Sequence, residues 1–259
     1  MRPTSLSMRP LARLKSLYMH KLAYDLHLHS CLSPCGDEDM TPANIVGMAV
    51  VKGLDLIAVT DHNTCRNCKP VLHWAEYYGI LAVPGMELTT EEEVHVVCLF
   101  PSLEKALEFD SLVYSKLNLF PNKESIFGPQ LLCDEEDQVI GHEPNLLIQS
   151  TRISFDQVQP LVEQYDGVMI PAHIDKNSHS LLYNLGFVPV DSRFTAVEIK
   201  EEEKVEELKE QNPYLRRCRI LHDSDAHYLK DIHEPKFYLE VEERTAAAVV
   251  KALKDANKV

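Results

Sequence analysis

The sequence predicts an α/β fold of about seven strand–helix units, a number that fits a barrel. Short apolar runs alternate with amphipathic segments along the chain, as expected when strands alternate with helices. Several of the predicted helices are followed by glycine, the residue that helix C-termini favour. A chain of 259 residues with 45% hydrophobic residues is large enough for one such domain with a single core.

The elements follow one another from residue 24 onward. Strands are predicted at residues 24–29, 54–60, 80–88, 94–100, 167–173, 195–200, 217–227 (with its loop) and 236–241. Helices are predicted at residues 42–53, 69–79, 102–117, 154–165, 178–187, 202–211 and 243–256. Residues 120–150 are irregular, and so long a stretch inside a compact domain usually forms a lid or a binding loop. We therefore expect a lid at about residues 101–150 in a domain that spans 24–259.

The composition excludes several classes of protein. A net charge of −14 argues against binding to long nucleic acids, which depends on clustered Lys and Arg. No apolar run approaches the roughly 18 residues needed to cross a bilayer, so no membrane partner is expected. Seven cysteines without a disulfide-like spacing indicate reduced thiols and a cytoplasmic location.

The N-terminal 23 residues differ from the rest, because they carry five basic residues and no acidic ones. We interpret residues 1–23 as a basic extension, either a frayed end or the product of a start codon placed too early. An organelle transit peptide is the alternative.

Metal-ligand residues gather where the predicted strands end. They are His27, His29, Asp61, His62, Glu87, His95, His173, Asp225 and His227. The loops after the carboxyl ends of parallel strands form one face of such a fold, where catalytic groups collect. Alternate residues of a strand point to the same side, so His27 and His29 can hold one ion together. Mixed imidazole and carboxylate ligands suit Zn²⁺, Fe²⁺ or Mn²⁺. A single histidine would most simply be a packing residue, but the clusters together predict a metal-dependent hydrolase.

A family resemblance rests on the order of these motifs. YDLHLHSCLSPCGDEDMTPANIV, LDLIAVTDHNT, VPGMEL with VHVV, IPAH and HDSDAH together resemble the polymerase-and-histidinol-phosphatase (PHP) superfamily over about residues 24–240. The resemblance implies a distorted (β/α)₇ barrel with a site for up to three metal ions at the C-terminal ends of the strands. It also implies hydrolysis of phosphoesters by metal-activated water.

The resemblance also implies a ligand set. His27, His29, Glu87 and Asp225 would hold one ion; Glu87, His95 and His173 a second; His62, His227 and a residue of the loop after HLH a third. Counting back from Thr41-Pro42 indicates Asp37 for that last residue. Asp61 is expected either to support the site or to cap a strand end. His227 or His95 would act as a general acid if it holds no ion.

Other residues are candidates for contacts with substrate or for a second site. Arg152 and Lys176 are candidate phosphate contacts and Asn63 a candidate hydrogen-bond donor, although a surface role is the alternative for both cations. Cys31, Cys35, Cys65 and Cys68 would form an additional metal or cluster site if their loops meet, and otherwise remain free thiols.

The expected function is hydrolysis of a small phosphomonoester, a nucleotide or a short oligonucleotide. A histidinol-phosphate phosphatase is an alternative within the same class. A non-catalytic regulatory barrel with structural metals, or metal-dependent hydrolysis at carbon, are alternatives from other classes.

Overall fold

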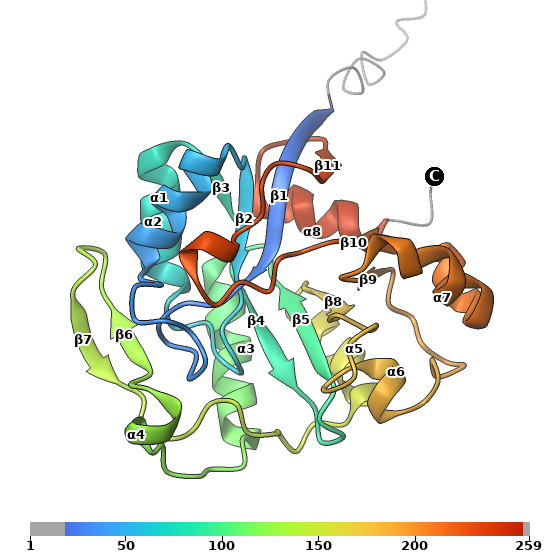
Figure 1. Cartoon of the computed structure of the whole chain (residues 1–259), viewed down its shortest axis with the longest axis horizontal. Helices are drawn as coiled ribbons and strands as arrows, with labels where there is room; N and C mark the ends of the chain where they lie inside the picture. Colours follow the sequence, from blue (N-terminus) through green and yellow to red (C-terminus); the bar gives the residue numbers. More distant parts are fainter. Residues whose placement is uncertain (1–18, 256–259) are drawn as a thin grey trace, which may run out of the picture.

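The computed structural model describes residues 19–255 (Figure 1). Most of the basic extension predicted at residues 1–23 lies outside this range. Its last residues do not form an extension, because strand β1 begins at His20 and pairs with a C-terminal strand from His20 to Ala23.

Outside residues 120–150, where the sequence predicts no regular element, the helices and strands lie close to the positions that the sequence predicts. Their bounds are β1 (His20–Leu28), α1 (Pro42–Lys52), β2 (Leu56–Val59), α2 (Cys68–Tyr78), β3 (Leu81–Ala82), β4 (Gly85–Thr89), β5 (His95–Leu99), α3 (Leu103–Lys116), α4 (Glu124–Phe127), β6 (Leu131–Cys133), β7 (Val139–His142), α5 (Phe155–Gln164), β8 (Val168–Pro171), α6 (Leu181–Asn184), β9 (Ala196–Glu198), α7 (Val205–Gln211), β10 (Arg219–Leu221), β11 (Tyr238–Val241) and α8 (Ala246–Lys254). Gly53 and Gly79 end α1 and α2 in the left-handed conformation, with φ of 83° and 76°.

The strands form a mixed α/β fold rather than a closed parallel barrel. Within residues 19–255 they make four sheets, in the orders β11-β1-β2-β3, β4-β5-β8, β10-β9 and β6-β7. Single bridges join Leu28 of β1 to Ala226 in the loop after β10, and His62 in the loop after β2 to Glu87 of β4. The expected all-parallel arrangement fails in the middle of the chain, where β5 runs antiparallel to both β4 and β8. The reason is the connection at residues 90–94, which is too short for the crossover that a parallel pair needs.

Helices lie on several sides of the sheets (Figure 1). Helices α1 and α2 pack apolar side chains such as Ile45 and Val71 in one buried cluster with residues of β1 and β2. Helices α3 and α5 do the same with β4, β5 and β8, and α8 packs Val249 and Leu253 with β1 and β11. These rigid elements fix the backbone from which the metal-ligand residues project.

The segment 101–150, expected to be a lid, has two parts. Helix α3 is part of the main core, because Ala106, Phe109 and Val113 are fully buried. The hairpin β6–β7 follows α4, and Leu131 N–H donates to the carbonyl of Cys31 at 2.8 Å. The hairpin therefore lies against the loop after β1, and α3 belongs to the core rather than to the expected lid.

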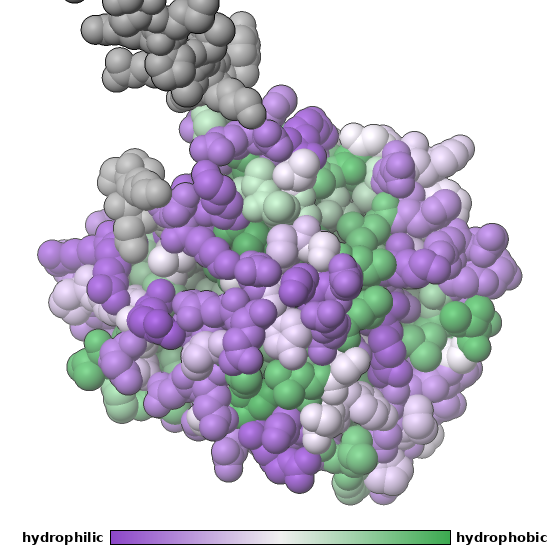
Figure 2. Space-filling model, turned by 180° about the vertical axis from the view of Figure 1, so that it is seen from behind, coloured by the Kyte–Doolittle hydropathy of each residue, from purple (hydrophilic) through white to green (hydrophobic). Residues whose placement is uncertain are grey.

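No helix within residues 19–255 is long and apolar enough to cross a bilayer. Hydrophilic residues cover most of the face shown in Figure 2, and hydrophobic residues appear there in separate patches.

Candidate metal centre

Strand β1 delivers the first two ligand-type side chains. His27 and His29 lie two positions apart, are fully buried, and bring their Nε2 atoms to within 3.2 Å of each other. Ser33 Oγ lies 2.9 Å from Nδ1 of His29 and so fixes the orientation of that ring. The extended backbone thus directs both rings toward one point.

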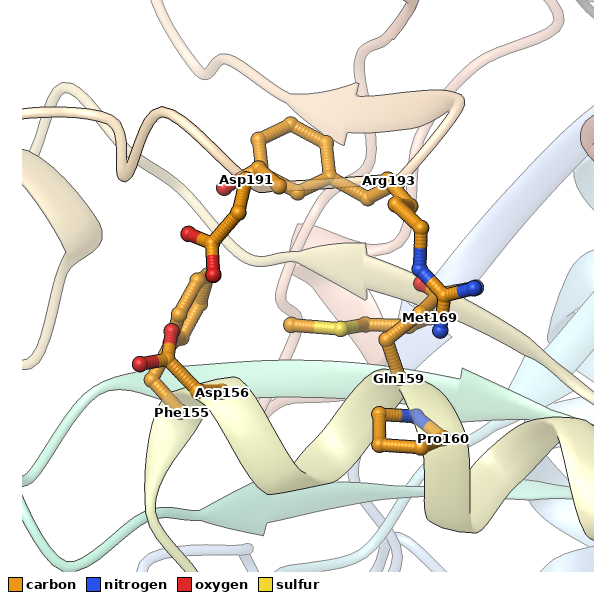
Figure 3. A pocket seen from close by; sticks show the side chains of 9 residues that line it. Phe155, Asp156, Gln159, Pro160, Met169, Asp191 and Arg193 are labelled. Carbon is orange, nitrogen blue, oxygen red and sulfur yellow. The ribbon is translucent and has the colours of Figure 1, made fainter.

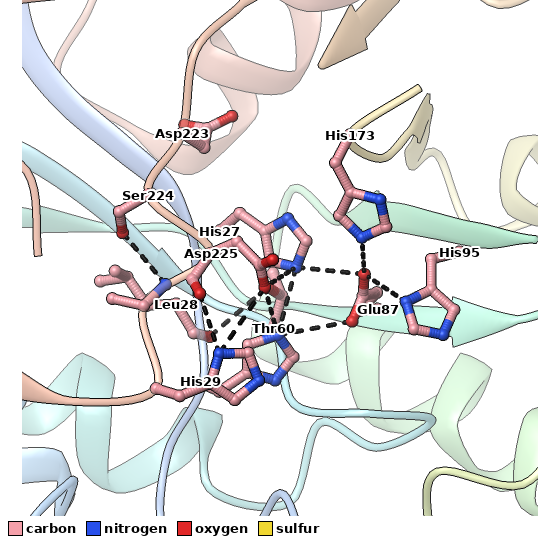
Figure 4. A network of polar contacts seen from close by, with 12 residues as sticks. His27, Leu28, His29, Thr60, Glu87, His95, His173, Asp223, Ser224 and Asp225 are labelled. Carbon is pink, nitrogen blue, oxygen red and sulfur yellow. Dashed lines mark hydrogen bonds and ion pairs between the residues drawn. The ribbon is translucent and has the colours of Figure 1, made fainter. Parts of the chain in front are cut away.

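Glu87, at the middle of β4, stands at the centre of the cluster (Figure 4). Its carboxylate lies 3.3 Å from His27 Nε2, 3.4 Å from His29 Nε2, 3.0 Å from His62 Nδ1, 2.9 Å from His95 Nδ1 and 3.1 Å from His173 Nε2. The backbone N–H of Glu87 donates to the carbonyls of Thr60 and Asp61, which holds β4 beside the end of β2. One carboxylate in contact with five imidazoles is suited to bridge two cations.

Asp225 approaches the same cluster from the loop after β10. Its Oδ1 lies 3.5 Å from His27 Nε2 and 3.3 Å from His29 Nε2. A left-handed backbone, with φ of 53°, turns this residue inward. His227 stacks on the ring of His29 at 4.2 Å between centroids.

The donor set fits divalent cations. Three groups place their ligand atoms within 4.8 Å of one another: His27, His29 and Asp225; His62, Glu87 and His95; and His29, His62 and His227. His62 Nδ1 and Glu87 Oε2 lie 3.0 Å apart, are buried, and have no hydrogen-bond partner. Unpartnered buried polar atoms cost free energy, and a bound cation would satisfy them.

The carboxylates of the cluster are held in their ionised form. Burial raises the pKa of Glu87, but His95, His27 and His62 lower it further, and the result lies well below the ordinary value. Burial also raises the pKa of Asp225, but His27 and His29 lower it further, and the result lies below the ordinary value. Both carboxylates are therefore ready to bind a cation at neutral pH.

The histidines divide into two sets. Burial lowers the pKa of His95 to about 4 and that of His227 to about 3 despite nearby carboxylates, so both rings are uncharged at neutral pH. Burial acts to lower the pKa of His29 and His62 too, but nearby groups outweigh it. Asp225 and Glu87 raise the pKa of His29 to about 9. Cys35 and Glu87 raise that of His62 to about 9. A cation bound there would displace protons from the second set.

Two carboxylates support the cluster from outside. Glu198, buried in β9, lies 2.7 Å from Nδ1 of His27 and fixes that ring with Nε2 inward. Asp61 accepts hydrogen bonds from Ser30 N–H, Ser30 Oγ and Ser33 Oγ at 2.6–2.7 Å. The sequence analysis missed Glu198, although a glutamate within the apolar strand TAVEIK was the available signal.

A pocket of about 210 Å³ opens onto the cluster. Its lining includes His62, Glu87, His95, His173, Asp225 and His227, together with Cys35, Lys176 and His179. Lys176 Nζ pairs with Asp225 Oδ2, and Asp225 keeps the pKa of this lysine raised although burial acts to lower it. His179, also missed from the sequence, stacks on the ring of His95 at 4.8 Å.

Three expected site residues do not reach this pocket. Asp37 accepts the N–H of Asp39 in an exposed turn, so its carboxylate serves the loop. Asn63 donates to the carbonyls of Leu147 and Gln149 and accepts from Thr89, and it is fully buried without a free group for substrate.

Arg152 is the third of them. Its guanidinium donates to the carbonyl of Ser115 in an exposed position, where it ties residue 152 to the end of α3. It does not line the pocket.

The four cysteines that would share a site if their loops met lie in separate places. Cys31 pairs with Cys133 at 3.7 Å between sulfur atoms, and Cys65 lies beside Cys68. Burial raises the pKa of Cys65 well above its ordinary value, so this thiol stays protonated. Cys35 lines the pocket at the metal cluster instead, so of the two alternatives that the sequence left open, the free thiols are the one found.

A second pocket, of about 170 Å³, lies between α5 and the segment before β9 (Figure 3). Asp156, Asp191 and Arg193 contribute its charged side chains, and Phe155 and Met169 its apolar ones. It shares no residue with the metal cluster, so the chemistry belongs to the first pocket.

Comparison with known proteins identifies the family to which the sequence is similar. A sequence model described as PHP domain matches residues 25–253. An uncharacterized protein of Methanocaldococcus jannaschii is 34% identical over 92 residues, which cover 32% of this chain and 54% of that protein. A 5′-3′ exoribonuclease of Haemophilus influenzae is 33% identical over 79 residues, which cover 29% of this chain and 28% of that enzyme. The matches thus span about half or less of these relatives.

Solved structures share the fold at low sequence identity. The lesion-specific endonuclease PfuEndoQ from Pyrococcus furiosus superposes with a TM-score of 0.62 and 19% identity, over 91% of this chain and 56% of that chain. A two-domain protein from Bacteroides vulgatus, which contains a predicted PHP-like metal-dependent phosphoesterase, gives a TM-score of 0.52 and 18% identity over 99% of this chain and 68% of that chain.

Proposed function

Because the chain belongs to the PHP domain family, we propose that it is a metal-dependent phosphoesterase that acts on a phosphomonoester, a nucleotide or a short oligonucleotide. The observation that carries this proposal is the convergence of five imidazoles on the buried carboxylate of Glu87. Such a site, open to solvent through one pocket, is suited to hydrolysis without a serine or cysteine nucleophile.

We assign two or three divalent ions, zinc, manganese or iron, to three groups of side chains. His27, His29 and Asp225 would hold one ion, His95 and His173 a second that shares Glu87, and His29, His62 and His227 contribute to a third. Bound ions of this kind activate water at neutral pH and neutralise charge on phosphate oxygens.

The chain itself supplies the remaining functions. Lys176, about two-fifths exposed at the pocket and held positive by Asp225, is the proposed contact for a phosphate oxygen. His179 is exposed at the same pocket and belongs to none of the three ligand groups, so we assign it the proton donation to the leaving oxygen. His227, expected in that role from the sequence, is instead among the ligand atoms.

Two arguments limit the substrate. The acidic chain disfavours long nucleic acids, whose binding depends on basic surfaces. The similar proteins named as an exoribonuclease and an endonuclease act on phosphodiesters, which keeps the end of a short oligonucleotide among the candidates. A pocket of about 210 Å³ accommodates a phosphate and part of a nucleoside rather than a helix.

Metal analysis combined with a substrate panel tests the proposal. The panel contains simple phosphomonoesters, 5′-nucleotides, histidinol phosphate and short single-stranded oligonucleotides. We expect turnover of at least one class by the wild type and by His142→Ala, which changes an exposed histidine on the hairpin, and none by His29→Ala. Bound metal without turnover of any phosphoester would instead favour a regulatory domain or hydrolysis at carbon.

A variant pair tests the two assigned pocket residues. Lys176→Met should raise KM for the phosphoester found, whereas Lys204→Met, which changes a lysine that pairs with the exposed Glu201, should leave KM unchanged. His179→Gln should lower kcat and remove a basic limb of the pH–rate profile, because it removes the proposed proton donor. An unchanged pH profile in His179→Gln would assign proton donation elsewhere.

A further inference from the structure

Two cysteines meet at the contact between the hairpin β6–β7 and the loop after β1. Cys31 lies in that loop, and Cys133 is the last residue of β6. Their sulfur atoms are 3.7 Å apart, and the hydrogen bond from Leu131 N–H to the carbonyl of Cys31 holds the two backbones side by side. A relative movement of less than about 2 Å would bring the sulfurs to the disulfide bond length of about 2.0 Å.

Apolar packing at this contact is sparse. Cys31, Leu131 and Cys133 form a small buried cluster, separate from the larger clusters that hold the main sheets. Leu132 is half-buried against a second small cluster, and the side chains of β7 are mostly exposed. The hairpin also lies at the outer edge of the molecule (Figure 1). Segments with few buried apolar contacts open locally more often than a core does, so we expect this contact to open without global unfolding.

Local opening matters because the closed contact shields both sulfurs. Cys31 is 3% exposed and Cys133 is 4% exposed. Opening of the hairpin would admit a reagent as small as a peroxide, and closing would return the two sulfurs to contact. The pair is therefore arranged to react with each other after one of them has been oxidised.

The same contact adjoins the walls of the metal pocket. The loop that begins at Cys31 carries Cys35, and the segment after β7 carries Ile148; both residues line the pocket. Gln130, the residue before β6, accepts the N–H of Leu147 at 2.8 Å and so ties that segment to the hairpin. A covalent bond at the cysteine pair would therefore restrain the two walls relative to each other.

We propose that Cys31 and Cys133 form a reversible disulfide that fastens the hairpin β6–β7 to the loop after β1. The oxidant is a peroxide. One thiol reacts with hydrogen peroxide to give a sulfenic acid and water. The other sulfur then attacks the sulfenic sulfur, so the S–S bond forms, the S–O bond breaks, and the hydroxyl group leaves with the second thiol proton as water. A thiol reductant restores both thiols by exchange.

Peptide mapping tests the proposal. Reduced wild type, Cys133→Ser and Cys218→Ser are treated with hydrogen peroxide, denatured, alkylated and analysed by mass spectrometry; Cys218 lies in a different apolar cluster. We expect peptides linked through Cys31 and Cys133 in wild type and in Cys218→Ser, and their loss after treatment with dithiothreitol. In Cys133→Ser, Cys31 should form no cross-link.

The wild type alone also tests the proposal, so the result does not depend on how a variant folds. Cys35 is the exposed cysteine among the residues that the structure describes, and its oxidation shows that the peroxide dose suffices. The proposal would be overturned if Cys31 and Cys133 stay fully alkylated at a dose that oxidises Cys35. A cross-link from either of them to another cysteine would overturn it as well.

Limited proteolysis tests the effect on the hairpin. Cleavage within residues 120–150 should be slower in oxidised wild type than in reduced wild type, and dithiothreitol should restore the faster rate. Peroxide should not slow cleavage in Cys133→Ser. Equal rates in the reduced and the cross-linked wild type would show that the bond does not fasten the hairpin. Neither measurement uses turnover or bound metal, so failure of the proposed function and failure of this inference are distinguishable.

Discussion

Nδ1 of His27 lies 2.7 Å from Oε2 of Glu198, and neither side chain is exposed to solvent. The carboxylate accepts the Nδ1 proton, so Nε2 is left to face Glu87 and Asp225. Burial alone would lower the pKa of His27, but Glu198, together with Glu87 and Asp225, holds it well above the ordinary value. Strand β9 therefore controls a ligand that strand β1 delivers.

The first prediction concerns this pair. Glu198→Gln should weaken metal binding by about 10–100-fold, because the ring of His27 loses the partner that orients it and makes it basic. Competition with a fluorescent chelator measures the affinity, and Glu201→Gln, at an exposed position three residues later, serves as the control. Equal affinities in the two variants would mean that Glu198 does not support the cluster.

Asp61 is predicted to act through the loop that carries His29 and Cys35. Its carboxylate accepts from Ser30 and Ser33 within the buried turn. In Asp61→Asn, an amide N–H₂ group would face the donors of Ser30 and Ser33. The loss of hydrogen bonds to a charged carboxylate should lower the free energy of unfolding by about 1.5–3 kcal/mol. Urea denaturation of the metal-free protein, beside Asp39→Asn as an exposed control, checks this; a midpoint equal to that of the control contradicts it.

Asp110 is predicted to make stability depend on pH. It accepts hydrogen bonds from Thr64 Oγ1 and Cys65 N–H, each at 2.7 Å, and burial raises its pKa above 3.8 despite them. The folded state thus holds the proton more tightly than the unfolded state, so the contribution of this carboxyl to stability falls as pH rises from about 4 through the folded pKa. Asp110→Asn keeps the accepting oxygen and should gain stability over wild type between pH 4 and pH 8.

Thermal unfolding at several pH values tests that gain. A difference between Asp110→Asn and wild type that does not change across this range would show that the carboxyl titrates alike in both states.

Asn67 is predicted to hold the hairpin β6–β7 against the site. Its Nδ2 donates to Ser30 Oγ and Leu131 O, and its Oδ1 accepts from Cys133 N–H. Asn67→Ala leaves buried groups unpartnered at a cost of about 1–3 kcal/mol each, so the hairpin should separate from the loop after β1 more often. Limited proteolysis should cut residues 120–150 faster in this variant; an unchanged rate would show that Arg66, paired with Glu143, suffices.

The sequence predicts the elements of this fold well and their pairing less well. Glycines 53 and 79, and the alternation in HLH, depend on local backbone chemistry, so α1, α2 and the orientation of His27 and His29 follow from short segments. The antiparallel position of β5 depends on how a five-residue connection packs, which apolar periodicity does not encode.

The sequence likewise predicts some residues of the candidate site and misses others. Glu87 and Asp225, which the sequence predicts at strand ends, do meet beside His27, although Glu87 lies at the middle of β4 and Asp225 in the loop after β10. Contacts that depend on loop geometry do not follow from spacing, which is why Asp37 was expected at the metal centre and Asn63 was expected to face substrate. Glu198 supports a ligand from a strand far along the chain, a contact that only the tertiary structure reveals.

The most direct test of the metal centre is the number of ions bound per chain, measured by mass spectrometry after purification without chelators, for wild type, Glu87→Gln and Glu91→Gln. Glu87 contacts all five inner imidazoles, whereas Glu91 is an exposed residue four positions later. We predict two or three ions in wild type and in Glu91→Gln and at least one fewer in Glu87→Gln. Wild-type protein that binds no ion after reconstitution with zinc, manganese or iron would contradict the account.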